Sequence, residues 1–173
     1  VDIPYPESMA RTVSNYREKP QWVLKQRNSW HGVDFAYHGS LEFDEFYRSY
    51  AETLLALDES IGRVLDHLEA TGMADNTLVL YMGDNGFLLG EHGLIDKRNA
   101  YEPSIRVPML AWAPGFIEPG RTIDALVRNI DIAPTLFELT GAQPTMKMDG
   151  SSFLQFLSGE AETGAGREFL YEY

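Results

Sequence analysis

Hydrophobic residues recur at helical spacing between residues 44 and 71. Successive apolar positions lie three or four residues apart, and charged residues fall between them. This alternation predicts a long amphipathic helix that packs its apolar stripe on a sheet, and Gly72 is the expected end of the helix. The stripe consists of Tyr50, Leu54, Leu57, Ile61, Val64, Leu65 and Leu68, of which Leu54, Leu57, Ile61 and Leu65 should face the sheet.

Two continuous apolar runs are expected to be core strands. Residues 77–82 are bounded on both sides by polar, turn-forming residues, which suits a strand buried on both faces. Residues 107–113 form a second run, closed by Pro114 and Gly115. Because a helix that feeds a buried strand is typical of α/β layers, the predicted fold class is α/β, with a mostly parallel sheet flanked by helices.

Shorter elements are expected in the rest of the chain. Residues 1–43 lack any periodicity and predict an ordered, loop-rich segment, and the polar, glycine-punctuated residues 87–103 predict a second loop. Asp131 is a plausible N-cap of a helix over residues 132–140, which Gly141 ends. The C-terminal region is expected to add a helical turn or two at 151–157, a Gly, Glu and Ala-rich stretch at 158–167 and the start of a strand at 167–173.

Composition and charge narrow the classes of function. The 173 residues are 44% hydrophobic and 12% aromatic, enough to bury a core of ordinary size. With 26 acidic and 14 basic residues the formal net charge is −12, which argues against a surface that neutralises nucleic-acid phosphates. There is no cysteine, which excludes disulfides, zinc-thiolate sites and a cysteine nucleophile within these residues. No apolar run approaches the roughly 18 residues of a membrane span.

Asp84 and Asn85 follow the strand predicted at 77–82, where ligands collect in α/β sheets. A carboxylate beside an amide carbonyl offers a hard cation such as Ca²⁺ one charged and one neutral oxygen. Two ligands do not complete such a site. The alternative is a plain turn, because Asn-Gly tolerates positive φ and Asp accepts hydrogen bonds from local amides.

Lys97 lies thirteen positions after Asp84, across a loop with glycines at 86, 90 and 93. Its ammonium could fold back over the strand end and hold an anionic oxygen, or it could simply be solvated. His92 could donate to a substrate oxygen, although a loop histidine between glycines is more often structural. Arg106 and Glu102 are expected to brace each other.

The ordered motifs around these residues resemble those of the type I sulfatases in the alkaline phosphatase superfamily. The similarity covers residues 44–157, and no single motif in it is specific. It implies a partial alkaline-phosphatase-like sandwich, with 1–43 as a loop-rich segment and 158–173 as the start of the C-terminal region. The motifs are Asp84-Asn85-Gly86, Leu89-Gly90-Glu91-His92-Gly93, Lys97, Tyr101-Glu102, Arg106-Val107-Pro108, Ile130-Asp131-Ile132-Ala133-Pro134-Thr135 and Met148-Asp149-Gly150-Ser151-Ser152.

The resemblance implies roles for three residues. Asp84 and Asn85 correspond to two calcium ligands, and Lys97 corresponds to a residue that contacts the substrate sulfate. The glycine-rich loop is more similar to the branch of sulfatases that act on glycans. The family's nucleophile, a Cys or Ser in a C/S-x-P-S-R motif that becomes formylglycine, is absent, as is its early Asp pair.

The absent motifs imply that this chain is the C-terminal part of a sulfatase catalytic domain, with little turnover of its own. Pro103-Ser104-Ile105-Arg106 lacks the required order, so Ser104 is not expected to be the nucleophile, and His31 and His38 receive no role. Expected partners are a sulfated small molecule or sulfated glycan, with no nucleic acid. The sequence leaves localisation open, and the resemblance suits a periplasmic, secreted or lysosomal enzyme.

Two other functions fit the same residues. A phosphodiesterase or phosphonate monoester hydrolase of the same superfamily would use the same metal and lysine geometry on phosphoryl oxygens. A non-catalytic calcium-binding or glycan-binding domain is the alternative from a different class. The nucleophile region would distinguish these possibilities.

Overall fold

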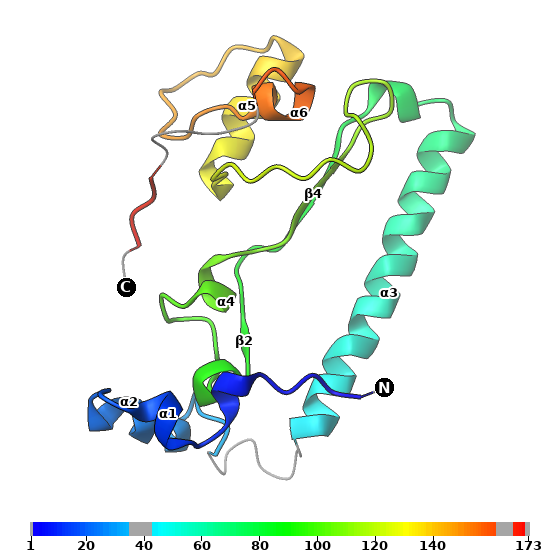
Figure 1. Ribbon diagram of the computed structural model, residues 1–173. Coiled ribbons are helices and arrows are strands. Elements are labelled where there is room, and N and C mark those ends of the chain that lie inside the picture. Colours follow the sequence, from blue (N-terminus) through cyan, green and yellow to red (C-terminus); the bar gives the residue numbers. More distant parts are fainter. Residues whose placement is uncertain (1, 35–42, 162–167, 172–173) are drawn as a thin grey trace. The chain divides into compact units, whose positions relative to one another are not determined.

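The computed structural model describes residues 2–34, 43–161 and 168–171 (Figure 1). The chain forms two compact units. One consists of Val1–Asp66 and Asn85–Val107, and the other of His67–Asp84 and Pro108–Tyr173.

Short helices follow one another in the first 34 residues, where the sequence predicted an ordered, loop-rich segment. Thr12 caps one of them, because its side-chain oxygen accepts a hydrogen bond from Asn15 N at 3.3 Å. Residues 35–42, which include His38, lie outside the described residues. The helices are η1 (Glu7–Met9), α1 (Val13–Tyr16), α2 (Gln21–Lys25) and η2 (Gln26–Asn28).

A small antiparallel hairpin occupies the stretch 87–103 that was predicted to be loop. Strand β2 (Leu88–Leu89) pairs with β3 (Ile95–Asp96), and the 3-10 helix η5 (Glu91–Gly93) joins them. The prediction missed these strands because they are two residues long, too short for periodicity to register. Burial of Leu88 and Leu94 anchors the hairpin. The short helix α4 (Glu102–Ile105) follows.

Residues from the N-terminal segment extend this hairpin on its other side. Gly32 forms an antiparallel bridge with Leu94. Val33 N donates to Gly93 O at 3.0 Å, and Ile95 N donates to His31 O at 2.7 Å. Thus β3 is held between β2 and residues 31–33.

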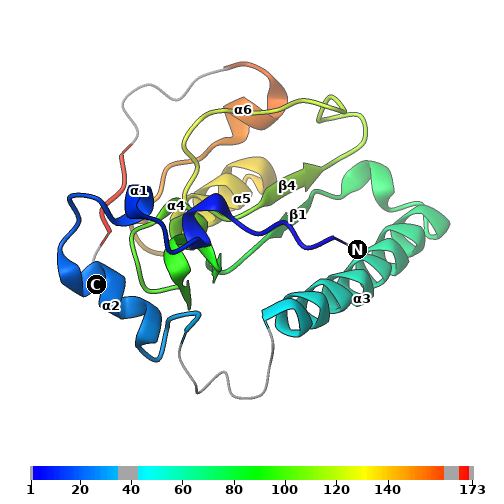
Figure 2. The same cartoon turned by 60° about the horizontal axis from the view of Figure 1, so that its bottom comes forward.

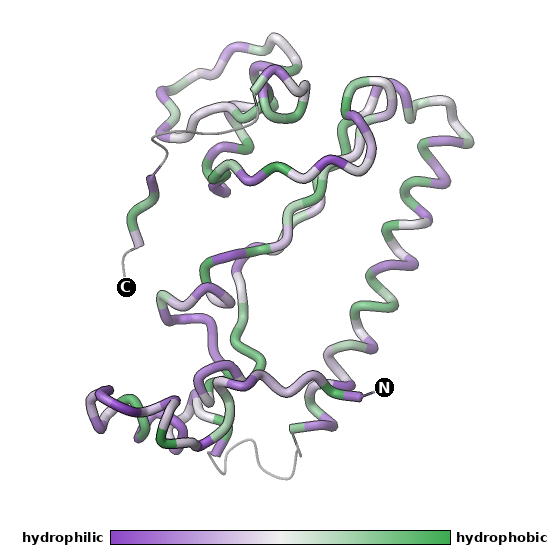
Figure 3. The backbone as a smooth tube through the Cα atoms, in the orientation of Figure 1, coloured by the Kyte–Doolittle hydropathy of each residue, from purple (hydrophilic) through white to green (hydrophobic). Residues whose placement is uncertain are grey.

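The long helix is confirmed, but the predicted burial of its stripe is wrong for two positions. Helix α3 runs from Phe43 to Ala70, and Gly72 follows with φ +69°. Apolar and polar residues alternate along it (Figure 3). Leu54 and Leu57, however, are 44% and 39% exposed, and no described residue of α3 is buried. Periodicity predicts which positions form an apolar face, but it does not supply the surface that covers them.

The second unit contains both predicted core strands. Strand β1 (Val79–Met82) pairs antiparallel with β4 (Met109–Trp112), and Val79 lies opposite Trp112 (Figure 2). The α/β class holds, but both ladders among the described residues are antiparallel, so the expected parallel arrangement is not seen in them. No long crossover helix connects β1 to β4, and parallel neighbours need such a connection. Both strands are mostly half-buried instead of buried on both faces.

The main apolar core of this unit gathers around α6 (Leu154–Ser158), which confirms the helical turns expected at 151–157. Phe153, Phe156 and Leu157 are buried together there. Helix α5 (Ile132–Thr140) has the predicted bounds and ends at Gly141, where φ is +70°. Residues 168–171 form no strand, which contradicts the predicted strand start over the described part of 167–173. The 3-10 helices η4 (Ala74–Asn76) and η6 (Asn129–Asp131) complete the unit.

Asp131 does not cap α5, contrary to the prediction. Its carboxylate is fully buried and accepts hydrogen bonds from Arg128 N at 2.9 Å, from the Arg128 guanidinium and from Ser151 N at 2.8 Å. These bonds raise the pKa of Arg128. No side-chain cap hydrogen bond forms at the start of α5, because the carboxylate accepts from these donors instead.

Candidate functional site

Asp84 and Asn85 lie directly after β1, as predicted, and both are exposed. The boundary between the two compact units falls between them. In its own unit, the backbone carbonyl of Asp84 accepts a hydrogen bond from Asn129 Nδ2 at 3.3 Å. This contact fixes the backbone at the start of the turn.

Lys97 returns to Asn85, as the glycine-rich loop predicted. Its Nζ donates to Asn85 Oδ1 at 2.9 Å. The Asn85 amide in turn donates from Nδ2 to Gly86 O at 2.8 Å, which directs Oδ1 away from that carbonyl. The ammonium and the amide oxygen therefore meet at one point of the first unit.

The return of Lys97 depends on the hairpin and on Gly86. Strands β2 and β3 reverse the chain, and Lys97 follows β3 immediately. Gly86 N donates to Ser104 O at 3.0 Å, and a Cβ at Gly86 would lie 2.1 Å from Pro103 O. Only glycine permits this close approach of two backbones.

The donor set at Asn85 suits a hard cation in part. An amide oxygen has two lone pairs, so Asn85 Oδ1 can accept from Lys97 and still ligate an ion. In this structure the cation at Oδ1 is the Lys97 ammonium itself. Ca²⁺ requires six to eight oxygens. Within the described ranges, no group of three or more His, Cys, Asp and Glu residues could hold a metal.

His92 is held in the loop of the same unit by contacts on three sides. Its ring stacks on Tyr101 with centroids 4.0 Å apart and planes 24° apart. Its backbone N donates to Ser8 Oγ at 3.1 Å, and its carbonyl accepts from Tyr16 Oη at 3.5 Å. Burial lowers the pKa of His92, and the positive charge of Lys19 lowers it further, against the opposing effect of Glu91. His92 is therefore mainly neutral near pH 7.

A buried carboxylate beside Lys97 was not identified from the sequence. Asp96 accepts from Arg98 Nε at 3.1 Å and from Asn99 Nδ2 at 3.3 Å, and His31 Nδ1 lies 3.6 Å from it. His31 received no role from the sequence because it lies outside the motifs that carry the resemblance, and it is 65 positions away from Asp96. The run Asp96-Lys97-Arg98 places a carboxylate beside two cations, and this local pattern could have indicated the ion pair between Asp96 and Arg98.

Arg106 and Ser104, two further residues of this region, can be compared with the sequence predictions. Arg106 Nε lies 3.5 Å from the Glu102 carboxylate in an exposed ion pair, which confirms that the two residues brace each other. Ser104 is buried, and its Oγ is the one buried side-chain polar atom without a hydrogen-bond partner among the described residues. A hydroxyl shielded from solvent agrees with the prediction that Ser104 is not the nucleophile.

A family model decides the classification. The model described as Sulfatase matches residues 2–142. This chain belongs to the sulfatase family. The predicted resemblance and the α/β fold class are thereby confirmed, and the alkaline-phosphatase-like architecture agrees with the solved neighbours.

N-acetylglucosamine-6-sulfatases are among the most similar relatives. The N-acetylglucosamine-6-O-sulfatase of Bacteroides thetaiotaomicron is 40% identical over 126 residues, which cover 73% of this chain and 23% of the relative. The human N-acetylglucosamine-6-sulfatase is 34% identical over 189 residues, covering all of this chain and 34% of the relative. The chain thus spans about a quarter to a third of the length of these curated relatives.

Solved structures give the same picture. A protein in complex with its substrate D-glucosamine-2-N,6-O-disulfate superposes with a TM-score of 0.69 at 34% identity, covering 96% of this chain and 37% of the other. The phosphonate monoester hydrolase of Silicibacter pomeroyi superposes with a TM-score of 0.67 at 30% identity, covering 76% of this chain and 26% of the other. Over the described residues, no helix has the length and apolarity that crossing a bilayer requires.

Proposed function

We propose that the protein hydrolyses sulfate esters of a sulfated glycan, with an amino sugar carrying a 6-sulfate as the substrate class. Two observations support this proposal. Lys97 contacts Asn85, which follows β1 in the sequence, and the chain belongs to the sulfatase family. The names of the relatives, which are N-acetylglucosamine-6-sulfatases, support the choice of sugar. The 173 residues are proposed to be part of one catalytic domain.

The role of Lys97 follows from the charge that builds up during sulfate ester cleavage. Negative charge develops on the leaving oxygen and spreads over the sulfuryl oxygens. An exposed ammonium can exchange its hydrogen bond with Asn85 Oδ1 for one with a sulfuryl oxygen. Lys97 therefore binds the sulfate and stabilises the transition state.

Asp84 and Asn85 are proposed to hold a calcium ion together with ligands from outside this chain. Their carboxylate and amide oxygens are donors that Ca²⁺ accepts. A bound divalent ion would supply electrostatic stabilisation of the sulfuryl oxygens. We also propose that a formylglycine nucleophile comes from outside these residues, so that the 173 residues alone have little or no turnover.

His92 is proposed as a hydrogen-bond donor to the substrate. Its lowered pKa keeps the ring neutral, so one ring nitrogen carries a proton that it can donate without adding charge. Stacking on Tyr101 fixes the plane of the ring.

Phosphonate or phosphate ester hydrolysis is the second candidate. The likeness to a phosphonate monoester hydrolase, at 30% identity and a TM-score of 0.67, favours it. Sulfuryl and phosphoryl groups are both tetrahedral and anionic, so Lys97 would suit either.

The two candidates are separated by assaying the full-length protein on N-acetylglucosamine 6-sulfate and on a phenyl phosphonate monoester. The proposal predicts a higher kcat/KM for the sulfate ester. A higher kcat/KM for the phosphonate would establish the alternative, and activity on neither compound would contradict both.

A further inference from the structure

The basic residues of this acidic protein are concentrated in one segment. Residues 8–31 contain five of the 14 basic residues but one of the 26 acidic residues. Arg27 is buried and paired with Asp34, and the four others are exposed. They are Arg11, Arg17, Lys19 and Lys25.

The same segment exposes two large aromatic side chains. Trp22 is 60% exposed and Trp30 is 52% exposed, and these are two of the three tryptophans of the chain. Exposed charges alone are ordinarily just solvated. Exposed tryptophans are different, because a large aromatic side chain in contact with water offers apolar surface to a ligand.

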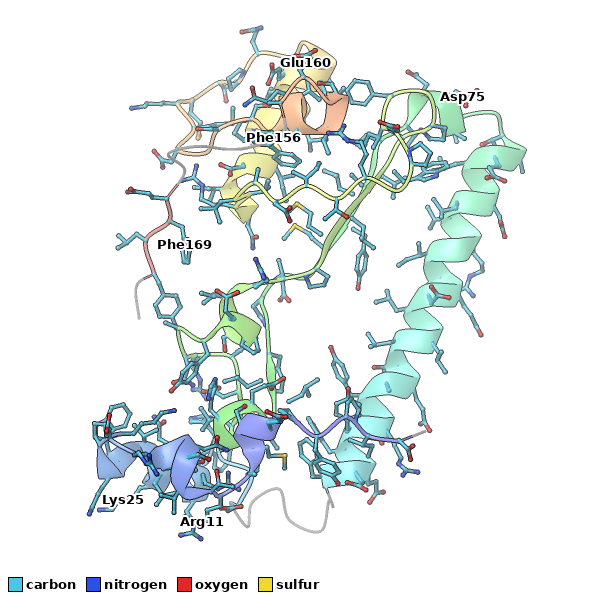
Figure 4. The ribbon with its side chains drawn as sticks, viewed as in Figure 1. Arg11, Lys25, Asp75, Phe156, Glu160 and Phe169 are labelled. Carbon is cyan, nitrogen blue, oxygen red and sulfur yellow. The ribbon has the colours of Figure 1, made fainter. Side chains whose placement is uncertain are left out.

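A network of hydrogen bonds anchors the segment. The Arg27 guanidinium makes a bidentate pair with Asp34 at 2.8 and 3.1 Å, and it also donates to Met9 O and to Tyr16 Oη. Asn15 Nδ2 donates to Glu7 O and to Ala10 O. The exposed cations therefore project from a braced scaffold, as Figure 4 shows for Arg11 and Lys25.

The segment adjoins the loop that carries His92, within one compact unit. Ser8 and Tyr16 both hydrogen-bond to the His92 backbone, and the charge of Lys19 acts on its ring. At its other end, residues 31–33 pair with 93–95, directly before Lys97. A polymer whose sulfated sugar lies at Lys97 would find this segment beside it.

We call residues 8–31 the basic segment. We propose that the basic segment forms an accessory surface, which binds the anionic sugars next to the hydrolysed sugar in a polymeric sulfated glycan. The cations pair with sulfate and carboxylate groups of neighbouring sugars, and Trp22 and Trp30 stack on sugar rings. The proposal deepens the proposed function and rests on it for the identity of the polymer. The basic segment carries a net positive charge, whereas the whole chain has a net charge of −12. Polyanions are therefore attracted to this segment and repelled by the acidic surface elsewhere.

The test measures binding of a heparin-derived octasaccharide to the full-length protein, apart from hydrolysis. The variant R11Q/R17Q/K25Q removes three exposed cations of the basic segment. R48Q/R63Q/K147Q is the matched control, since it removes three exposed cations elsewhere with the same change in net charge. We expect the first variant to lower affinity about tenfold or more and to reduce the salt dependence of binding, and the control to bind as the wild type does.

Tryptophan fluorescence supplies a second, independent readout. Octasaccharide binding should change the emission, and W22A/W30A should abolish most of that change and weaken binding. Equal affinity of the wild type and both triple variants, with no fluorescence response, would overturn the proposal. Tighter binding to phosphatidylserine vesicles or to RNA than to the octasaccharide would overturn it in favour of those partners.

Failure of this inference is distinguishable from failure of the proposed function. A protein that binds the octasaccharide through the basic segment but hydrolyses no sulfate ester would refute the function alone. A protein that hydrolyses N-acetylglucosamine 6-sulfate but binds the octasaccharide equally well in both triple variants would refute the surface alone.

Discussion

At the scale of single residues, the contact between Lys97 and Asn85 could be predicted because both belong to one short stretch. Three glycines in the intervening loop make the return possible, and the Lys97 ammonium lies 2.9 Å from Asn85 Oδ1. The Asp96 cluster could not be predicted, because His31 reaches it through backbone pairing of distant segments. Sequence spacing therefore predicts contacts between residues that are close in the chain, but it does not predict contacts that arise when distant segments pair.

Removal of the Asp84 carboxylate tests the proposed metal site. Asp84→Ala in the full-length protein should lower calcium content and cripple sulfate release, since it deletes the one charged ligand that this chain is proposed to supply. Asp75→Ala removes an exposed carboxylate just before β1 and serves as the control. Normal calcium content, by elemental analysis, and normal activity in Asp84→Ala would contradict the assignment.

The lowered pKa of His92 predicts a pH dependence of stability. The unfolded protein binds a proton to His92 at higher pH than the folded protein does, so stability from this residue is present above about pH 6.5 and is lost as the pH falls below it. Urea unfolding at pH 7.5 and pH 5.5 should therefore show a smaller loss on acidification in His92→Gln than in the wild type. An equal loss in both proteins would show that burial of His92 does not oppose its protonation.

At the scale of elements, periodicity predicted helices and the longer strands correctly but did not predict their surroundings. The bounds of α3 and α5 were predicted within a residue or so, because the spacing of apolar residues and the terminal glycines Gly72 and Gly141 are local signals. Strand direction and burial depend on which segment lies alongside. The antiparallel pairing of β1 with β4 therefore could not be predicted from the sequence of either strand.

The support of η5 by Arg27 can be tested at Gly93. This glycine has φ +75°, and a Cβ there would lie 2.4 Å from Arg27 Nη1. Gly93→Ala should destabilise the protein by about 1–3 kcal/mol, through both backbone strain and displacement of the guanidinium.

Gly62→Ala is the matched control for this steric prediction. Gly62 lies inside α3, and a Cβ added there would have nothing within 4 Å of it. Alanine should therefore stabilise α3 by about 0.5–1 kcal/mol. Urea denaturation measures both variants, and a Gly93→Ala protein as stable as the wild type would show that the loop does not depend on this packing.

At the scale of the whole molecule, charge is distributed unevenly. In a chain with a net charge of −12, local cations are needed to attract an anionic substrate, and we propose that Lys97 and the exposed cations of the basic segment supply them. The composition gives the net charge, but it does not show that exposed cations are concentrated beside the loop that carries His92.

We propose that Lys97 binds the sulfate and acts in catalysis more than in folding. The most direct measurement compares kcat on N-acetylglucosamine 6-sulfate for the full-length wild type, Lys97→Ala and the control Lys147→Ala. Lys97 is exposed, so its loss should leave the thermal midpoint nearly unchanged while turnover falls about a hundredfold or more, by analogy with deleting one donor to a developing oxyanion. Turnover of Lys97→Ala equal to that of Lys147→Ala and the wild type would contradict the account.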